Sequence, residues 1–146
     1  MKGYLIEKRV SDSKNLRLIN LILSAAALWG GITIYILFRN NDYLSTISIL
    51  NNLKYDIQSP FVDFLKCHFT DFLWAFSFCC ALTVFLFKVS RKSIVAVGIS
   101  VSASGAVFEI CQLFHCIRGT YDFIDILMYC LATAVFALFN LKLLKN

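Results

Sequence analysis

Residues 93–115 read SIVAVGISVSASGAVFEICQLFH, and this stretch decides the class of the fold. It contains no lysine, arginine or aspartate and a single glutamate, Glu109. A helix crosses the hydrocarbon core of a bilayer with about 20 apolar residues, so this run is long enough to span it. Backbone groups that leave water must be hydrogen-bonded within the segment, which makes such a span helical.

Three further runs of the chain have the same apolar character. They are LRLINLILSAAALWGGITIYILF (16–38), FTDFLWAFSFCCALTVFLF (69–87) and YDFIDILMYCLATAVFALFNLKLL (121–144). The chain of 146 residues is 59% hydrophobic and 16% charged, whereas soluble domains carry about 25% charged residues. We therefore predict an all-α polytopic membrane protein, a single domain folded as a four-transmembrane-helix bundle.

Lysine and arginine are divided unevenly between the two sides of the predicted bundle. Ten lie before or at the start of the first run, between the second and third runs, or at the C-terminal end. The other side holds four, namely Arg39, Lys54, Lys66 and Arg118. The positive-inside rule places the side with ten in the cytoplasm, so both termini are predicted to be cytoplasmic. Topology also explains the net charge of +5, and no nucleic-acid partner is predicted.

The connection between the first two runs, Arg39–His68, is the longest of the chain. Apolar residues recur at helix-like spacing over Asp42–Leu53, so an amphipathic helix on the outer surface and an ordinary ordered loop both stay open. Ser59 followed by Pro60 is typical of a helix start. The second helix is therefore expected to begin above the membrane and to enter it near His68.

The third run carries small residues at helical spacing, at Gly98, Ser102, Gly105 and Ala106. Small side chains let two helices approach closely, with no lipid between them. We therefore expect this face of the third run to pack against another helix.

The chain has six cysteines and no CxxC pair, which gives no support to a zinc ribbon. Cys79, Cys80 and Cys130 lie inside apolar runs and are predicted to be small core residues. Cys67 and Cys116 both lie near one membrane face, and the sequence leaves open whether they pair.

Most acidic residues fall on the outer side or in the outer ends of the predicted helices. These are Asp42, Asp56, Asp63, Asp71, Glu109, Asp122 and Asp125. Glu109 follows the start of its run by 16 residues, which is about 24 Å along a helix axis and places it in the outer leaflet. Asp71 and Asp125 lie near the outer starts of their own runs, so all three reach a similar depth.

Carboxylates at one depth of a bilayer indicate a site. A charged residue at the centre of a span costs about 2.5–3.5 kcal/mol, so these groups should face one another, with Arg118 and a proton or cation as compensation. The predicted binding residues are His68, Asp71, Glu109, Gln112, Arg118, Asp122 and Asp125. Helix capping is the alternative for Asp71 and Asp122, while metal ligation stays open and no catalytic residue is identified.

Three stretches resemble the VanZ-like family of bacterial membrane proteins. They are HFTDFLWAFSF (68–78), FEICQLF (108–114) and RGTYDFIDIL (118–127), on consecutive runs. The resemblance covers roughly residues 59–138, and the chain departs from it at Tyr129, Ala132 and Thr133, where family members often carry asparagine and glycine. It implies a multi-pass protein of the bacterial plasma membrane and cell envelope. The founding member of the family is linked to resistance to the antibiotic teicoplanin.

Three classes of function are compatible with the sequence. We favour a non-enzymatic accessory or binding protein whose outer-leaflet pocket holds a lipid headgroup, a lipid-linked cell-wall precursor or a glycopeptide antibiotic. The second class is a membrane enzyme acting on a lipid-linked phosphate, although the chain has no P-loop or other cofactor motif. The third is a proton- or cation-coupled transporter. Membrane lipids are the predicted partners, and a homo-oligomer stays open.

Overall fold

The computed structural model describes residues 2–38, 59–86 and 88–145, and the side chains of 14–37, 59–86 and 88–145. Within these segments all regular structure is helical, and there is no strand. The elements are α1 (Lys2–Phe38), α3 (Pro60–Phe64), the π-helical turn η2 (Leu65–Phe69), α4 (Thr70–Phe85), α5 (Arg91–Leu113) and α6 (Phe123–Leu143). The amphipathic helix considered for Asp42–Leu53 lies outside the described residues.

Four helical stretches are long and apolar enough to cross a membrane, which confirms the predicted class. They are Lys14–Leu37, Pro60–Phe85, Arg91–Leu113 and Phe123–Leu143. The predicted helix start before the second span is also confirmed, because Ser59 is the N-cap and Pro60 the first helical residue. The Asp63 backbone amide donates to the Ser59 carbonyl oxygen at 2.9 Å and closes the first turn.

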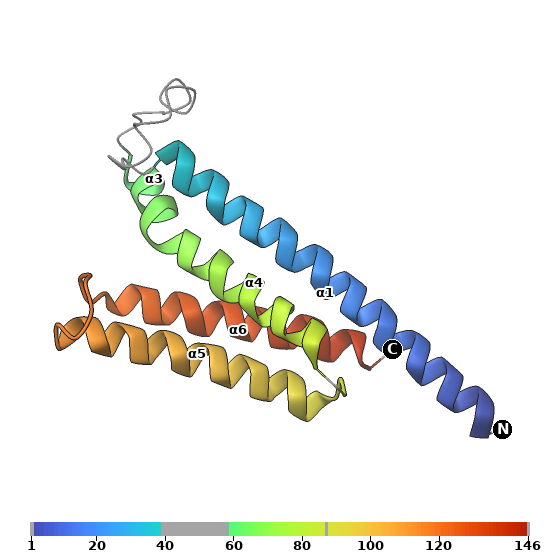
Figure 1. Ribbon diagram of the computed structural model, residues 1–146. Coiled ribbons are helices and arrows are strands. Elements are labelled where there is room, and N and C mark those ends of the chain that lie inside the picture. The colour runs from blue at the N-terminus through green and yellow to red at the C-terminus, as the bar shows by residue number, and fades with distance from the viewer. Residues whose placement is uncertain (1, 39–58, 87, 146) are drawn as a thin grey trace.

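The helices form two arms that meet at one end of the bundle. Figure 1 shows α1 running beside α4 and α5 running beside α6. The arms lie close together where α4 joins α5 and diverge toward the turn between α5 and α6. We call these two places the α4–α5 end and the α5–α6 end. The predicted site residues from η2, α4, α5 and α6 lie toward the α5–α6 end, where His68 of η2 contacts Asp125 of α6.

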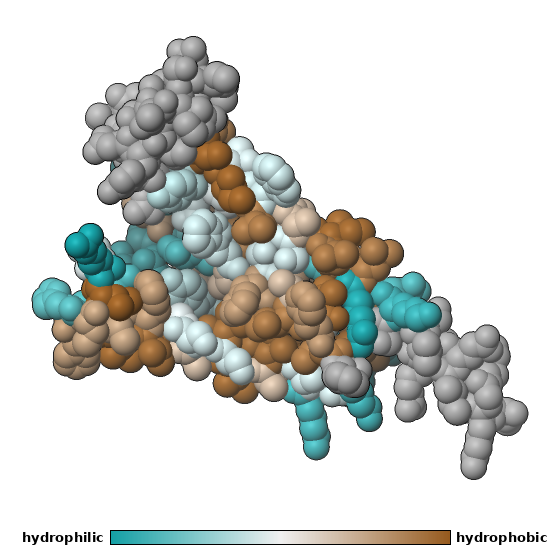
Figure 2. Space-filling model, in the orientation of Figure 1, coloured by the Kyte–Doolittle hydropathy of each residue, from teal (hydrophilic) through white to brown (hydrophobic). Residues whose placement is uncertain are grey.

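The surface of the bundle suits a bilayer. Figure 2 shows hydrophilic residues toward the two ends and pale or brown residues between them. Large apolar side chains such as Trp29, Ile99 and Leu138 are exposed on the flanks of the helices. Lipid tails solvate such side chains as well as a protein interior does, so a membrane protein leaves them outside.

The core of the bundle lies where α4, α5 and α6 meet. Its fully buried members include Cys79, Cys80, Ile94 and Phe136. All six cysteines are free, and Cys79 and Cys80 are buried as predicted. The prediction for Cys130 is wrong, since it is exposed. Successive helical residues are about 100° apart, which turns position 130 of α6 away from the core. Cys67 and Cys116 are both exposed and unpaired.

The small-residue face of α5 packs against α6, as the sequence predicts. Gly98 lies against Thr133, and the Ser102 hydroxyl is hydrogen-bonded to the Thr133 hydroxyl at 2.6 Å. One turn further on, a Cβ atom placed on Gly105 would overlap the ring of Tyr129. Glycine at position 105 is therefore what lets the Tyr129 ring lie flat against α5.

Polar side chains that the sequence analysis did not single out hold the α4–α5 end together. The Asn20 side-chain amide of α1 donates to Asn140 Oδ1 of α6 at 2.7 Å, and both residues are fully buried. Farther along α1, the Ser77 hydroxyl donates to the Ser24 carbonyl oxygen at 2.9 Å. The two contacts join residues that are 120 and 53 positions apart in the sequence.

Replacing Asn140 with leucine is expected to lower the free energy of unfolding by about 1 kcal/mol, because interhelical hydrogen bonds in membranes contribute about 0.6–1.7 kcal/mol. The measurement is SDS-induced unfolding in mixed micelles, followed by circular dichroism. The Asn20→Leu variant and the double variant complete a cycle. Additive losses would show that the two amides do not interact.

Candidate functional site

His68 is the residue around which the site is built. It lies in η2, where the chain makes a π-helical turn between α3 and α4. Such turns insert an extra residue and are frequent at functional sites. The imidazole packs at a tilt on the Phe64 ring, with 5.6 Å between the ring centroids. Its Nδ1 lies 2.8 Å from Asp125 Oδ1 and 3.9 Å from Asp122 Oδ2. Since a carboxylate only accepts, Nδ1 carries the proton and donates it to Asp125.

The two carboxylate oxygens of Asp122 make different contacts. It is the N-cap of α6, and its Oδ1 accepts from the Ile124 backbone amide at 2.8 Å. The capping interpretation of Asp122 is therefore correct, and capping occupies only one of its two carboxylate oxygens. Oδ2 faces His68 instead. Asp125 follows one turn later on the same face of α6.

Glu109 is the most deeply buried member of the site, with 2% of its surface exposed. Its Oε2 accepts the backbone amide of Asp122 at 3.1 Å, so it ties α5 to the start of α6. The Gln112 amide nitrogen lies 3.3 Å from the same oxygen and 2.8 Å from the Thr120 carbonyl oxygen. In the opposite amide orientation the Gln112 oxygen would face two other oxygen atoms that can only accept. The amide is therefore assigned with its nitrogen toward Glu109 and Thr120.

The turn between α5 and α6 has a defined backbone conformation that positions Gln112. α5 ends at Leu113, His115 follows the C-cap residue Phe114 at φ 55°, and the Cys116 amide donates to the Cys111 carbonyl oxygen at 2.8 Å. This is a Schellman cap. Gly119 follows at φ 142°, and a Cβ atom there would approach the Gln112 amide to 2.6 Å. Only glycine therefore fits position 119 without moving the side chain that donates to Glu109.

Tyr129 belongs to the site and was not among the predicted residues. Its side chain is close enough to the carboxylates of Glu109, Asp71 and Asp125 to interact with them electrostatically. A signal for it exists in the sequence, because position 129 follows Asp125 by four residues and shares its helix face. The apolar neighbours of Tyr129 make it resemble an ordinary packing residue.

The structure brings together six of the seven predicted residues and leaves one apart. Asp71 is half-buried and near enough to Tyr129 to interact with it electrostatically. Arg118 is exposed in the α5–α6 turn. Among the described residues, no ion pair joins Arg118 to Glu109, Asp122 or Asp125. We call His68, Asp71, Glu109, Gln112, Asp122, Asp125 and Tyr129 the polar cluster.

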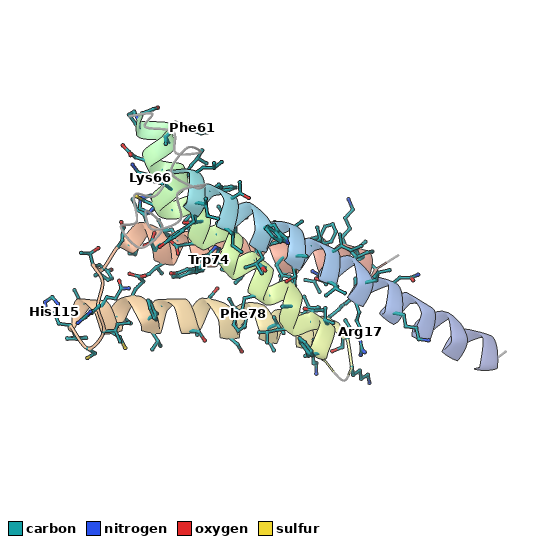
Figure 3. The ribbon with its side chains drawn as sticks, turned by 45° about the horizontal axis from the view of Figure 1, so that its top comes forward. Arg17, Phe61, Lys66, Trp74, Phe78 and His115 are labelled. Carbon is teal, nitrogen blue, oxygen red and sulfur yellow. The ribbon has the colours of Figure 1, made fainter. Side chains whose placement is uncertain are left out.

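An apolar groove of about 550 Å³ lies next to the polar cluster. Its lining comes from all four long helices and includes Leu28, Trp74, Phe78, Phe108 and Tyr129. Figure 3 shows Trp74 and Phe78 on α4, on the side toward α5. Both are about half exposed, as are Leu28 and Phe108, so the groove opens sideways between the two arms.

Tyr129 is where groove and polar cluster meet. Its ring lines the groove, and its side chain is close enough to Glu109 to interact with it. The site thus joins the apolar groove, which lies between the spans, to the carboxylate-rich polar cluster at the α5–α6 end. An amphiphile has the same division into a long apolar part and a polar end.

Comparison of the chain with known protein families, curated proteins and solved structures found no match. The length and hydropathy of the helices show its class directly. The chain is a multi-pass helical membrane protein, with four membrane-length helices among its described residues.

Proposed function

We propose that this protein binds a membrane amphiphile, with the apolar tail in the groove and the polar headgroup at the polar cluster. The observation that carries the proposal is the position of Tyr129, which lines the groove and is close enough to the Glu109 carboxylate to interact with it. A groove that opens to the bilayer lets an apolar tail enter from the lipid and pack against protein. Polar groups at the end of the groove then determine which headgroup is bound. The favoured role is binding rather than catalysis.

The ligand classes we propose are a phospholipid, a lipid-linked cell-wall precursor and a lipoglycopeptide antibiotic. The arrangement of three motifs, residues 68–78, 108–114 and 118–127, supports them through the resemblance to VanZ-like proteins. On this proposal the protein lies in the bacterial plasma membrane with both termini in the cytoplasm. The polar cluster then faces the outer leaflet, where cell-wall precursors and glycopeptides meet.

Filling the groove is expected to weaken ligand binding at least fivefold. Ser104 lines the groove on α5, and Ser104→Phe places an aromatic ring where the tail would lie. The matched control is Val107→Phe, because Val107 is 58% exposed on the same helix and does not line the groove. The measurement is native mass spectrometry of the full chain with phosphatidylglycerol, a polyprenyl phosphate and teicoplanin as separate probes.

The probe that responds identifies the ligand class. A loss of binding in Ser104→Phe, with normal binding in Val107→Phe, supports the proposal. Equal binding of all three probes by wild type and Ser104→Phe would contradict it. A drop of the same size in both variants would mean that added bulk on α5, and not the groove, weakens binding.

A second candidate is an enzyme acting on a lipid-linked phosphate. The close approach of His68, Asp122 and Asp125 favours it, because an imidazole beside carboxylates can serve as general base or hold a metal ion. Release of phosphate from the polyprenyl phosphate probe by wild type, but not by His68→Gln, would establish this alternative. Transport ranks third, since the groove is lined mainly by apolar side chains.

A further inference from the structure

Three side chains of the polar cluster present metal-binding atoms to one point. They are His68 from η2 and Asp122 and Asp125 from the start of α6. The distance from His68 Nδ1 is 3.9 Å to Asp122 Oδ2 and 2.8 Å to Asp125 Oδ1. One oxygen or nitrogen atom from each residue lies within 4.8 Å of the others.

The spacing suits a first-row divalent ion. Zn²⁺ binds imidazole nitrogen and carboxylate oxygen at about 2.0–2.1 Å, and in a tetrahedral site its ligands are then about 3.3 Å apart. The two distances from His68 Nδ1, 2.8 and 3.9 Å, bracket that value. Small rotations of two aspartate side chains therefore bring all three atoms into ligand positions. Three protein ligands leave the fourth position open.

One contact in the site uses metal-binding atoms, the hydrogen bond from His68 Nδ1 to Asp125 Oδ1 at 2.8 Å, so an ion bound here would replace the Nδ1 proton. The other contacts of these side chains leave those atoms free. His68 packs on Phe64 through its ring face. Asp122 caps α6 with Oδ1, which leaves Oδ2 free to face the site. Glu109 accepts the Asp122 backbone amide from behind, in the way outer groups orient a metal ligand. The three side chains are thus already close together, and an ion would take the place of the proton between His68 and Asp125.

The charge of the site favours a cation. Asp122 and Asp125 are two carboxylates within reach of one imidazole, with side-chain exposures of 40% and 17%. In the described segments, no lysine or arginine lies within ion-pair distance of either carboxylate. Buried and half-buried charges are retained where they are paired or coordinate a metal. A divalent ion would compensate both carboxylates at once.

We propose that His68, Asp122 and Asp125 form a binding site for one divalent transition-metal ion, with Zn²⁺ as the ion that fits best. One consequence rests on the proposed function: the open position would take a phosphate oxygen, so the amphiphile would carry a phosphate headgroup. A carboxylate-rich pocket repels phosphate by itself, and a bound cation turns that repulsion into attraction.

The test is Zn²⁺ binding to the full chain in detergent micelles, after treatment with chelator and without added lipid. Competition with a chromophoric chelator gives the affinity and the number of ions bound. We expect one ion per chain, with affinity at least tenfold weaker in His68→Gln and in Asp125→Asn. Two variants are used so that a folding defect in one leaves the other informative, and circular dichroism checks the helices.

Two control variants separate this site from other metal-binding groups. Cys67→Ser removes the exposed thiol beside His68, and Asp63→Asn removes a carboxylate that pairs with Lys66. Both should leave the Zn²⁺ affinity unchanged. Wild-type affinity in His68→Gln and Asp125→Asn would overturn the proposal, and so would loss of binding in Cys67→Ser.

The phosphate consequence is measured separately with the polyprenyl phosphate probe, with and without Zn²⁺. Zn²⁺-dependent binding of that probe supports the consequence. Zn²⁺ binding without any effect on the probe would remove the phosphate headgroup and leave the metal site standing. Failure of all lipid probes together with normal Zn²⁺ binding would overturn the proposed function alone.

Discussion

Replacing Glu109 with leucine is expected to lower the free energy of unfolding by about 2–4 kcal/mol. The Glu109 side chain is 2% exposed, accepts a hydrogen bond from the Asp122 backbone amide, and lies against the Gln112 amide nitrogen and Tyr129. A buried donor without an acceptor costs about 1–3 kcal/mol, and polar contacts between membrane helices contribute somewhat less each. SDS titration of the purified protein in mixed micelles, followed by circular dichroism, measures the loss.

The control for this prediction is Glu109→Gln. Glutamine has nearly the same size and keeps one oxygen that can accept from Asp122, so the expected loss is below about 1.5 kcal/mol. A result in which both variants lose equal stability would show that the charge of Glu109, and not its hydrogen-bond acceptors, stabilises the fold. No loss in either variant would show that the contacts of Glu109 serve binding alone.

Gly105→Val is expected to lower the free energy of unfolding by about 2–3 kcal/mol and to disturb the polar cluster. A Cβ atom at position 105 overlaps the Tyr129 ring, so either the ring moves or α5 and α6 separate. Overpacking of a close helix contact costs about 1–3 kcal/mol, and displacement of Tyr129 also weakens its interaction with Glu109. The same SDS titration measures the stability.

Two further variants make the Gly105 prediction decisive. Ala103→Val adds similar bulk at an exposed position of the same helix, and a change of less than about 0.5 kcal/mol is expected there. In the Gly105→Val/Tyr129→Ala double variant the ring is gone, so the added methyl groups should cost much less than they do in the wild-type background. Strictly additive losses would contradict the proposed overlap between position 105 and Tyr129.

The four helices and their class could be predicted from the sequence because the decisive physics is local. A backbone that leaves water must form its hydrogen bonds within its own helix, so about 20 apolar residues predict a span wherever they occur. The start of the second helix at Ser59 and Pro60 was predictable for the same reason. The ring of Pro60 fixes its own backbone angle for the first helical position, although the Ser59 side chain makes no capping hydrogen bond.

The depth of the candidate site was also readable in the sequence. Helical rise converts residue number into distance along the axis, and it placed Asp71, Glu109 and Asp125 at one level. The structure brings Glu109 and Asp125 to the same tyrosine, Tyr129, together with Asp71. The side of the membrane on which this level lies stays a prediction, since it rests on the distribution of lysine and arginine alone.

What the sequence by itself determined is therefore the number of spans, their approximate limits and the level of their polar residues. Only the tertiary structure decided which side chains meet: His68 with Asp125, Tyr129 with Glu109, and Asn20 with Asn140. It also set Arg118 apart from the carboxylates and opened the groove. The rotation of each helix and the angle between the two arms depend on how side chains distant in sequence fit together, and that fit is absent from any single helix.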